Sequence, residues 1–352
     1  MSTPLEIKSY DLATIDGLAA VQMNAIWNAT RTERMPDDPP IPLEEDLQGW
    51  RNLPEFVDVH EWLAWNPDHT RALAVGEVEV YRTEDNQHMA FFDIYVLPEF
   101  RQQGIGRQLL STLMPVVMEN RRRLLMTATH ANIPAGEAFM QRLGGSRGLE
   151  QRVNQLKMSK LDRGWVSKWA ADEHYPGFKL GLWEGMFPEE QIEAITELYQ
   201  LTNDAPREQL DYEDRQITSE QVLDMEQYQM ARGMQRWTMY VTDQASGRFA
   251  GFTEVFWNPN RPQLLTQGFT GVHPDFRGHS LGRWLKAAMI EKVIRERPEV
   301  KVVRTGNANS NVPMLKINTE MGFQLAQAAT IWQVETVKVL EYLKAREQPW
   351  NP

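Results

Sequence analysis

VLPEFRQQGIGR, residues 96–107, recurs with few changes as VHPDFRGHSLGR, residues 272–283. The valine, the proline, an acidic residue, the phenylalanine, the arginine and the closing Gly-Arg pair all stand at the same offset. In each copy a β-rich apolar run precedes the stretch, MAFFDIYV or LLTQGFTGV, and an amphipathic helical run follows it. A strand that enters a turn and then a helix leaves backbone N–H groups unpaired at the helix N-terminus. Each copy therefore predicts an anion-binding turn, called here the first cradle (residues 102–107) and the second cradle (residues 278–283).

The repeat indicates that the chain is one unit used twice. Its 352 residues favour about two domains on length alone, and the recurring stretch agrees with that number. We expect an N-terminal domain over residues 1–162 and a C-terminal domain over residues 178–352. The connector between them, residues 163–177, is rich in tryptophan and tyrosine, so we expect it to be packed and not floppy.

Composition restricts the partners. A formal net charge of -11 disfavours nucleic acid, whose binding normally begins with a basic face, and a small cationic substrate fits better. The absence of cysteine excludes disulfides, a thiolate nucleophile and a zinc–sulfur site, and it favours a cytoplasmic protein. The seven histidines show no paired spacing, so no metal site is expected. The opening residues MSTPLEIKSYD show neither the basic nor the apolar region of a secretory leader, and no apolar run approaches the roughly 20 residues that span a bilayer, so we expect no leader and no membrane partner.

Hydrophobic patterning predicts the same order of elements in each half. In the first half, strands are expected near residues 5–10, 60–65, 72–81, 89–96 and 123–129, and helices after residue 15, from residue 44, from residue 105 and over residues 134–143. In the second half, strands are expected near residues 178–183, 237–241, 249–257, 264–272 and 300–304, and helices over residues 189–201, 281–294 and 313–321. Turn-forming residues between the middle strands of each half predict an antiparallel meander.

This order, together with V-x-P-[ED]-F-R-x-x-[GS]-x-G, resembles the GNAT acetyltransferase superfamily, whose pyrophosphate-binding motif has the form (Q/R)-x-x-G-x-(G/A). In the second half the likeness extends to N-x-x-M-x-x-x-N-x-x-x-G-F, carried by Asn311, Met314, Asn318, Gly322 and Phe323. Two such units in one chain resemble mycothiol synthase and related bacterial acetyltransferases. The resemblance implies an α/β (α+β) fold of two tandem GNAT-like domains. Each would be a mixed, mostly antiparallel sheet flanked by helices and splayed between its fourth and fifth strands, with acetyl-CoA in the gap as acyl donor substrate.

By the same resemblance, each cradle would hold the pyrophosphate, and the preceding strand end would pair with the pantetheine. In the first half these positions are Val96, Leu97, Arg101, Gln102, Gln103, Gly104, Ile105, Gly106 and Arg107. In the second half they are Val272, His273, Arg277, Gly278, His279, Ser280, Leu281, Gly282 and Arg283, with Asn311 and Asn318 on a later helix. Ser280 stands where the family has its first glycine, and a side chain there costs about 1–2 kcal/mol if the position needs a positive φ. The alternative for either cradle is a capped turn without a ligand.

Acetyl transfer to an amine poses two proton problems of unequal size. An amine of pKa about 10.4 costs about 4–5 kcal/mol to deprotonate near pH 7, whereas a thiolate leaving group of pKa about 8.5 needs only about 2 kcal/mol of help. The base therefore matters more than the acid. Strand alternation places Phe91, Asp93 and Tyr95 on one face of the strand that enters the first cradle. Asp93 is thus the candidate base, and Glu77 and Glu79 on the neighbouring strand are candidates acting through water.

The second half departs from this arrangement. Phe269 stands in the place of the strand aspartate, and Glu254 is the nearest strand carboxylate. For each carboxylate the alternative is an exposed or salt-bridged strand residue. Many family members have a tyrosine acid four residues before the glycine of the closing Gly-Phe, and Met140 and Asn318 stand at those places here. We expect the second half to bind CoA more weakly or mainly to support the fold, although its match to the family's later helix keeps the opposite open.

The sequence thus predicts an acyl-CoA-dependent N-acyltransferase that moves acetyl from acetyl-CoA directly to a primary amine of a small molecule or peptide. A cationic amine fits the acidic stretches at residues 37–46 and 211–214, which in this family lean over the acceptor site. Two alternatives stay open. An aminoacyl transferase that uses charged tRNA is disfavoured by the acidic balance. A non-catalytic acyl-CoA-binding or regulatory protein would be distinguished by a failure to transfer acetyl when amines are offered.

Overall fold

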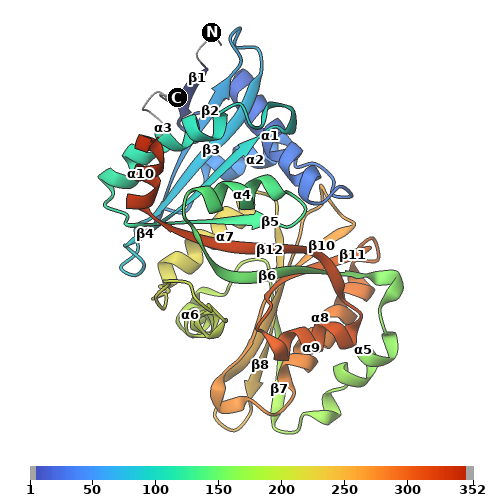
Figure 1. Cartoon of the computed structure of the whole chain (residues 1–352). Helices are drawn as coiled ribbons and strands as arrows, with labels where there is room; N and C mark the ends of the chain where they lie inside the picture. Colours follow the sequence, from blue (N-terminus) through green and yellow to red (C-terminus); the bar gives the residue numbers. More distant parts are fainter. Residues whose placement is uncertain (1–4, 346–352) are drawn as a thin grey trace. The chain divides into compact units, whose positions relative to one another are not determined.

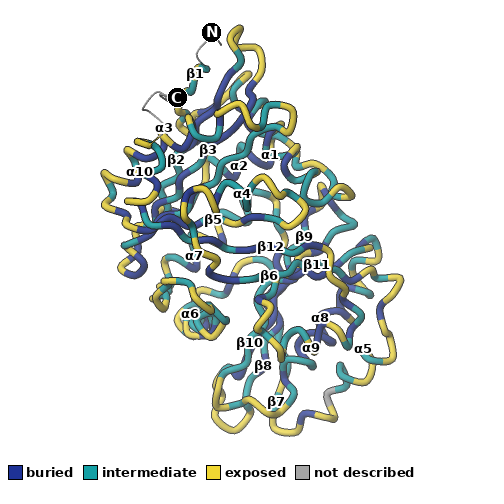
Figure 2. The backbone as a smooth tube through the Cα atoms, viewed as in Figure 1, coloured by how far each residue is buried: buried dark blue, intermediate teal, exposed yellow. Residues whose placement is uncertain are grey.

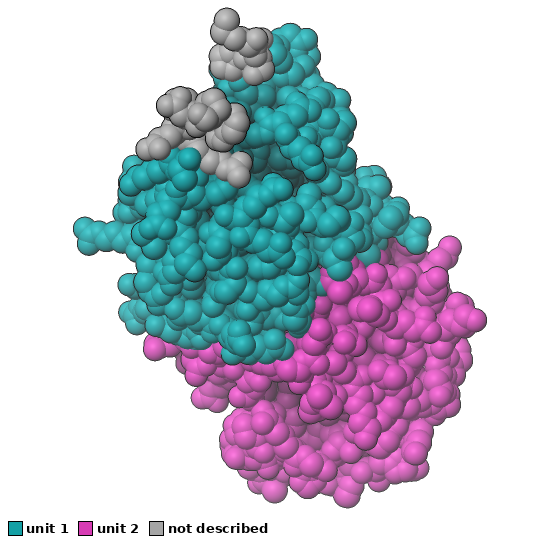
Figure 3. All heavy atoms as spheres, viewed as in Figure 1, with its two compact units in different colours: residues 1–150, 208–213, 329–352 teal, residues 151–207, 214–328 magenta. Residues whose placement is uncertain are grey.

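The computed structural model of the chain describes residues 5–345, which form two compact units (Figure 3). The first unit consists of the residues up to Glu150, the segment Glu208–Glu213 and the residues from Ala329 onward. The second unit consists of Gln151–Arg207 and Asp214–Ala328. Within the described residues, none of the helices has the length and apolar character of a membrane-spanning segment.

The first unit is built on a mixed sheet (Figure 1). Its strands, in the order in which they pair, are β1 (Glu6–Tyr10), β2 (Val57–Trp65), β3 (Ala72–Tyr81), β4 (Met89–Val96), β5 (Leu124–His130) and β12 (Gln324–Glu335). Neighbours pair antiparallel except β4 and β5, which are parallel. The predicted meander of three strands before the first cradle is therefore confirmed.

Helices cover both faces of this sheet. They are α1 (Gly17–Arg34), α2 (Leu43–Arg51), α3 (Ile105–Glu119), α4 (Pro134–Arg142) and α10 (Thr336–Ala345). Strand alternation sends one set of β3 side chains toward Leu109 and Leu113 of α3 and the other toward Met23 of α1, so two separate cores form. The strands contain long buried runs, such as residues 72–76 of β3, and most of the surface loops are exposed or half-buried (Figure 2).

The second unit repeats the arrangement. Its strands, in pairing order, are β6 (Ser146–Lys157), β11 (Val302–Ala308), β10 (Leu264–Val272), β9 (Phe249–Trp257), β8 (Gln235–Asp243) and β7 (Phe178–Glu184). Its helices are α5 (Arg163–Ala170), α6 (Ile192–Tyr199), α7 (Ser219–Ala231), α8 (Leu281–Glu296) and α9 (Val312–Met321). The sequence analysis did not predict α7, although Thr218 and Gln221 form a capping box at its start.

The last strand of each sheet comes from a distant part of the chain. In the first unit Ala329–Glu335 of β12 pairs with β5, and in the second unit residues 151–157 of β6 pair with β11. The boundaries expected from the sequence, 1–162 and 178–352, are therefore not the boundaries of the compact units. The predicted connector belongs to the second unit, where α5 packs against α8 through Val166.

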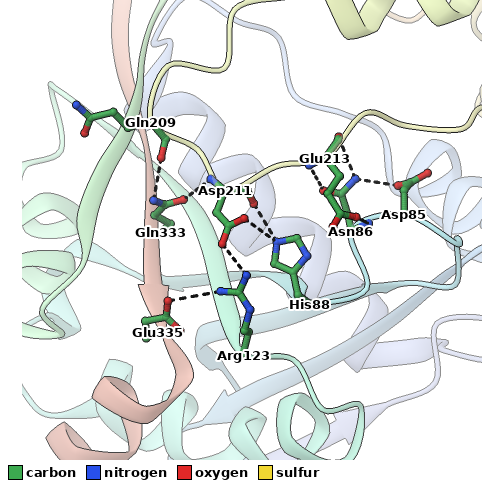
Figure 4. A network of polar contacts seen from close by, with 9 residues as sticks. All are labelled: Asp85, Asn86, His88, Arg123, Gln209, Asp211, Glu213, Gln333 and Glu335. Carbon is green, nitrogen blue, oxygen red and sulfur yellow. Dashed lines mark hydrogen bonds and ion pairs between the residues drawn. The ribbon is translucent and has the colours of Figure 1, made fainter.

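A short segment of the second half, Glu208–Glu213, also belongs to the first unit (Figure 4). The Asp211 carboxylate accepts from the Arg123 guanidinium at 2.7 Å. The Asn86 N–H donates to the Glu213 carboxylate, and the Glu213 N–H donates to the Asn86 side chain, each at 2.8 Å. Reciprocal hydrogen bonds of this kind satisfy the polar groups at the edge of the segment, which explains its membership of this unit.

Candidate active site

The first cradle begins α3 with two left-handed residues. Gln102 has φ 61° and Gly104, the N-cap, has φ 84°. A Cβ built on Gly104 meets no atom within 4 Å, so the space above the turn is open. No acceptor among the described residues is bonded by the N–H of Gly104, Ile105 or Gly106, whereas the Arg107 N–H donates to the Gly104 carbonyl at 3.1 Å. The N–H groups of residues 104–106 are thus available to an anion.

The second cradle has the same backbone. Gly278 has φ 88°, and Ser280, the N-cap of α8, has φ 59°. The condition for a backbone penalty at Ser280, a positive φ, is met, but it does not distinguish the two cradles. Each contains one glycine and one other residue in the left-handed region, Gln102 in the first and Ser280 in the second, so the backbone penalty is similar in both.

The strands splay apart at both cradles. Pairing between β4 and β5 ends at Phe91 and Met126, and pairing between β10 and β11 ends at Thr266 and Arg304. The gap implied by the family resemblance is therefore present in each unit. Backbone groups that face the gap from β4 have lost their strand partner, and they can pair with a ligand instead.

The backbone hydrogen bonds of the strand ends correct part of the prediction that Val96, Leu97, Val272 and His273 pair with the pantetheine. The Leu97 N–H donates to Leu73 of β3 at 3.0 Å, and the His273 N–H donates to Ala250 of β9 at 2.8 Å. Because successive residues of a strand point their backbone groups to opposite sides, Val96 faces the gap and Leu97 does not. The same holds for the pair that ends β10.

Arg101 and Arg277 each bind a backbone carbonyl at the end of the strand that precedes their turn. The Arg101 Nε donates to the Val96 carbonyl at 3.0 Å, and its two terminal nitrogens donate to the Glu33 carboxylate of α1 at 2.7 and 2.5 Å. Arg277 likewise donates to the Val272 carbonyl at 3.1 Å and to an aspartate of the second unit at 2.5 Å. Both guanidinium groups, predicted to bind the donor, are instead engaged by protein oxygens. The side chains of Ile105 and Leu281 are buried in the cores and leave only their backbone to a ligand.

A cavity of about 540 Å³ opens over the first cradle and into the gap between β4 and β5. One end is lined by α1 and the cavity-facing residues of β4. The middle is lined by the cradle and β5, and the other end by α4 and α10. The polar and aromatic side chains that the following argument uses are Arg34, Asp93, Tyr95, Arg107, Thr127, Phe139, Arg142 and Tyr342.

Asp93 lies at the α1 end of this cavity. The Thr127 hydroxyl of β5 donates to its carboxylate at 2.8 Å. Burial raises the pKa of Asp93 to about 6, and the Thr127 hydrogen bond and the Arg34 charge oppose that rise. Burial also raises the pKa of the Tyr95 phenol, whose ring contacts Trp27 edge-on with centroids 4.8 Å apart. Near neutral pH Asp93 is therefore mostly an ionised base, and Tyr95 is a protonated phenol.

A row of carboxylates crosses the same face of the sheet. Glu61 of β2 is the direct neighbour of Glu77 of β3, which is the direct neighbour of Asp93 of β4. Burial raises the pKa of Glu61 to about 7, although its hydrogen bond with Glu77 lowers that pKa. Burial, together with repulsion from the adjacent acids, raises the pKa of Glu77 well above its usual range. Burial also raises the pKa of the half-buried Glu79. Of these four acids, Asp93 is the one that lines the cavity, and its ionised carboxylate makes the α1 end receptive to a cation.

The other end of the cavity contains residues that the sequence analysis did not select. Phe139 and Arg142 come from α4, and Tyr342 comes from α10 at the end of the chain. Phe139 and Arg142 are three residues apart on a helix, a spacing that places them on one face. Tyr342 could not be found from the motif, because the exchange of β12 into this sheet brings it here.

In the second unit, hydrogen bonds between side chains of α8, α9 and β11 join the two sides of the corresponding gap. Arg283 of the second cradle donates to both oxygens of Glu320 on α9, at 3.0 and 3.1 Å. The fully buried Lys286 donates to the Asn318 side chain at 2.7 Å, and Asn318 donates to Asn307 of β11 at 2.8 Å. The predicted donor-binding Arg283 and Asn318 are thus occupied by protein partners.

The face of the second unit that corresponds to the carboxylate row is filled. Tyr199 of α6 donates to the buried Glu254 carboxylate at 2.8 Å, and burial raises the pKa of Glu254. Phe252 and Phe269 pack beside this pair within an aromatic cluster. The other predicted residue, Asn311, caps α9 by accepting from the Met314 N–H at 3.3 Å. Glu254 therefore lies in a core and not at an open site.

The profile of the Acetyltransferase (GNAT) family matches residues 23–144 and again residues 193–323, well over half of the chain. The chain therefore belongs to the acetyltransferase (GNAT) family, and it contains the family's fold twice. That fold implies acyltransferase activity. Among proteins with curated descriptions, none matches the sequence.

Two solved structures show the same tandem arrangement of the fold. A tandem GNAT protein from the clavulanic acid biosynthesis pathway, solved without acetyl-CoA, is 23% identical with a TM-score of 0.78, covering 95% of this chain and 99% of that one. A GCN5-related N-acetyltransferase from Sphaerobacter thermophilus is 16% identical with a TM-score of 0.66, covering 94% of this chain and 96% of that one. At these identities the likeness shows the shared fold alone. The resemblance to mycothiol synthase stays a prediction.

Proposed function

We propose that the first unit transfers the acetyl group of acetyl-CoA directly to a primary amine of a small molecule or peptide. The observation that carries the proposal is that one cavity contains both an open cradle of N–H groups and the Asp93 carboxylate. The cradle supports binding of the donor pyrophosphate, and the gap beyond Phe91 supports binding of the pantetheine. The acceptor then enters from the α1 end.

In this reaction the amine nitrogen attacks the thioester carbonyl carbon, a C–N bond forms and the C–S bond breaks. The amine proton passes to Asp93, either directly or through water, and the thiolate leaves with the electron pair. A base of pKa about 6 is well suited, because it is ionised near neutral pH and still basic enough to take the proton. Tyr95 lines the same cavity and stays protonated, so it can donate to the thiolate.

Acid assistance is the smaller contribution. The family's tyrosine position is Met140, which is 1% exposed and has no proton to give. The leaving thiolate has a pKa near 8.5, so it needs only about 2 kcal/mol of help near pH 7. The N-terminus of α3 adds a favourable field for the developing negative charge.

The carboxylate row supports a cationic acceptor. Glu77 and Glu79 are half-buried and flank Asp93, with Arg34 as the cation that faces Asp93 and Tyr95 from α1. An ammonium group placed among carboxylates in a low-dielectric site would be stabilised, and it would lower their raised pKa values. An uncharged acceptor would not lower these pKa values.

The test is a panel of primary amines offered with acetyl-CoA, read by free-thiol release and by mass spectrometry of the product. We expect amine-dependent thiol release and a product heavier by one acetyl group, with the highest kcat/KM for cationic amines. If acetyl-CoA binds but no amine in a chemically broad panel is acetylated, the protein is an acyl-CoA-binding protein and the proposal is wrong.

A further inference from the structure

The final helix of the described chain, α10, lies beside α3 in the first unit (Figure 1). Its buried Val339 is part of the same core as Leu110 and Leu113 of α3. One turn further on, the Tyr342 ring meets the Phe139 ring of α4 edge-to-face, with centroids 6.5 Å apart and planes at 89°. Both residues line the cavity. An aromatic pair from two distant segments therefore lines the cavity on the α3 side of the sheet, whereas Asp93 shares its strand face with Tyr95, which packs on the α1 side.

Two arginines line the same cavity. Arg142 is exposed and follows Phe139 on the same face of α4, and Arg107 stands in the first turn of α3. Both line the cavity. In a chain of net charge -11, positive groups on facing helices mark a place that attracts a polyanion. Guanidinium groups are also the side chains best suited to phosphate.

The second unit has the opposite charge at the matching place. Counted back from the glycine that follows each helix motif, Arg142 of α4 corresponds to Glu320 of α9, just as Met140 corresponds to Asn318. Glu320 neutralises Arg283, the counterpart of Arg107, through two hydrogen bonds. The helix after the cradle gap thus carries an arginine, Arg142, in the first unit and a glutamate, Glu320, at the matching position of the second unit.

We propose that Tyr342, Phe139 and Arg142 form a nucleotide seat, in which the aromatic rings hold the adenine of the acyl donor and Arg142 binds its ribose phosphate. This inference rests on the proposed function, because it takes acetyl-CoA as the donor. With the thioester at Asp93 and the pyrophosphate at the cradle, the nucleotide end of the donor falls at the far end of the cavity. Aromatic rings stack on bases, and arginine forms charge-assisted hydrogen bonds with phosphate.

The donor site of the first unit would then be completed by the end of the chain. The exchange of β12 into the first sheet leads directly into α10 and so delivers Tyr342 to the cavity. This gives the strand exchange a functional consequence.

The test measures binding of CoA, dephospho-CoA and pantetheine to the full chain by calorimetry. Tyr342→Ala is expected to weaken CoA and dephospho-CoA alike by at least about fivefold, since loss of a base stack is of that order. Arg142→Ala is expected to weaken CoA by about tenfold or more and to leave dephospho-CoA unchanged. Tyr342→Phe keeps the ring and should bind CoA within about twofold of the natural chain. Val337→Ala, at an exposed position of α10, is the matched control and should change nothing.

Pantetheine lacks the nucleotide, so its affinity should be the same in every variant. Equal losses for CoA and pantetheine would show a structural role for Tyr342, and unchanged CoA binding in both alanine variants would remove the seat. A natural chain that binds no CoA would refute the proposed function and the seat with it. Normal CoA binding with insensitive variants refutes the seat alone.

Discussion

Asp93→Asn removes the proposed base and leaves its surroundings almost intact. The Thr127 hydroxyl, which donates to the Asp93 carboxylate at 2.8 Å, can donate equally well to an asparagine oxygen, so the fold should persist. With a pKa of about 6, Asp93 is about nine-tenths ionised at pH 7. The acceptor amine costs about 4–5 kcal/mol to deprotonate at that pH. Because base catalysis typically contributes about 10²–10⁴-fold, we expect kcat to fall at least about 100-fold.

The assay is thiol release with a saturating cationic amine, from about pH 5 to about pH 9. In the natural chain the rate should rise through the Asp93 pKa of about 6, because the carboxyl must lose its proton to act as a base. In Asp93→Asn this limb should disappear, while the Kd for acetyl-CoA stays within about threefold, a difference below about 0.7 kcal/mol. Full activity of Asp93→Asn, combined with loss of activity in Glu77→Gln or Glu79→Gln, would show that the base is a neighbouring carboxylate and that Asp93 is structural.

Three further predictions concern stability and coupling. The folded-state pKa of Glu61 is raised from 4.5 to about 7, so its contribution to the free energy of unfolding is present below about pH 4.5 and is lost as pH rises through 7, a fall of about 3 kcal/mol. Glu61→Gln should abolish this fall, and denaturant unfolding at several pH values measures it. Burial lowers the pKa of Lys286 to about 7, which shows that its charged form is poorly accommodated. The double variant Lys286→Leu/Asn318→Met copies the apolar pair of the first unit and should raise the unfolding temperature near neutral pH. A lower unfolding temperature would show that the Lys286–Asn318 network stabilises the unit. Arg101→Met should lower the free energy of unfolding by about 1–2 kcal/mol, because it removes the two hydrogen bonds that join the first cradle to Glu33 of α1. Since this link connects the donor and acceptor sides of the site, KM should rise for both substrates, and unchanged KM values would contradict the prediction.

Much of the fold could be predicted because it depends on local pattern. The alternation in β2, β3 and β4 reads directly as half-buried strands, and the recurring cradle stretch requires a strand before it and a helix after it. The splay between β4 and β5 came from the family resemblance, and the end of pairing at Phe91 and Met126 confirms it.

The strand exchange could not be predicted from local pattern. The sequence analysis predicted neither β6 nor β12, and nothing in a strand's own sequence names the neighbour with which it pairs. For the same reason the sequence could not assign the segment Glu208–Glu213 to the first unit, although its reciprocal hydrogen bonds place it there.

For the site, sequence reasoning located the cradles and the carboxylates but misjudged what distinguishes the halves. The serine at position 280 seemed to be the difference, yet Gln102 occupies the left-handed region in the first cradle just as Ser280 does in the second. The real differences are tertiary. Glu320 neutralises Arg283, and Tyr199 fills the space beside Glu254, and both contacts join residues far apart in sequence.

The central claim is that the donor binds in the first unit and not in the second. Gly104→Glu places a carboxylate in the open space above the first cradle, and Ser280→Glu makes the matching change above the second. In calorimetric titration with acetyl-CoA the natural chain should bind one equivalent. Gly104→Glu should raise the Kd well over tenfold, and Ser280→Glu should leave it within about twofold. Two equivalent sites in the natural chain, or a large loss of affinity in Ser280→Glu with none in Gly104→Glu, would contradict the account.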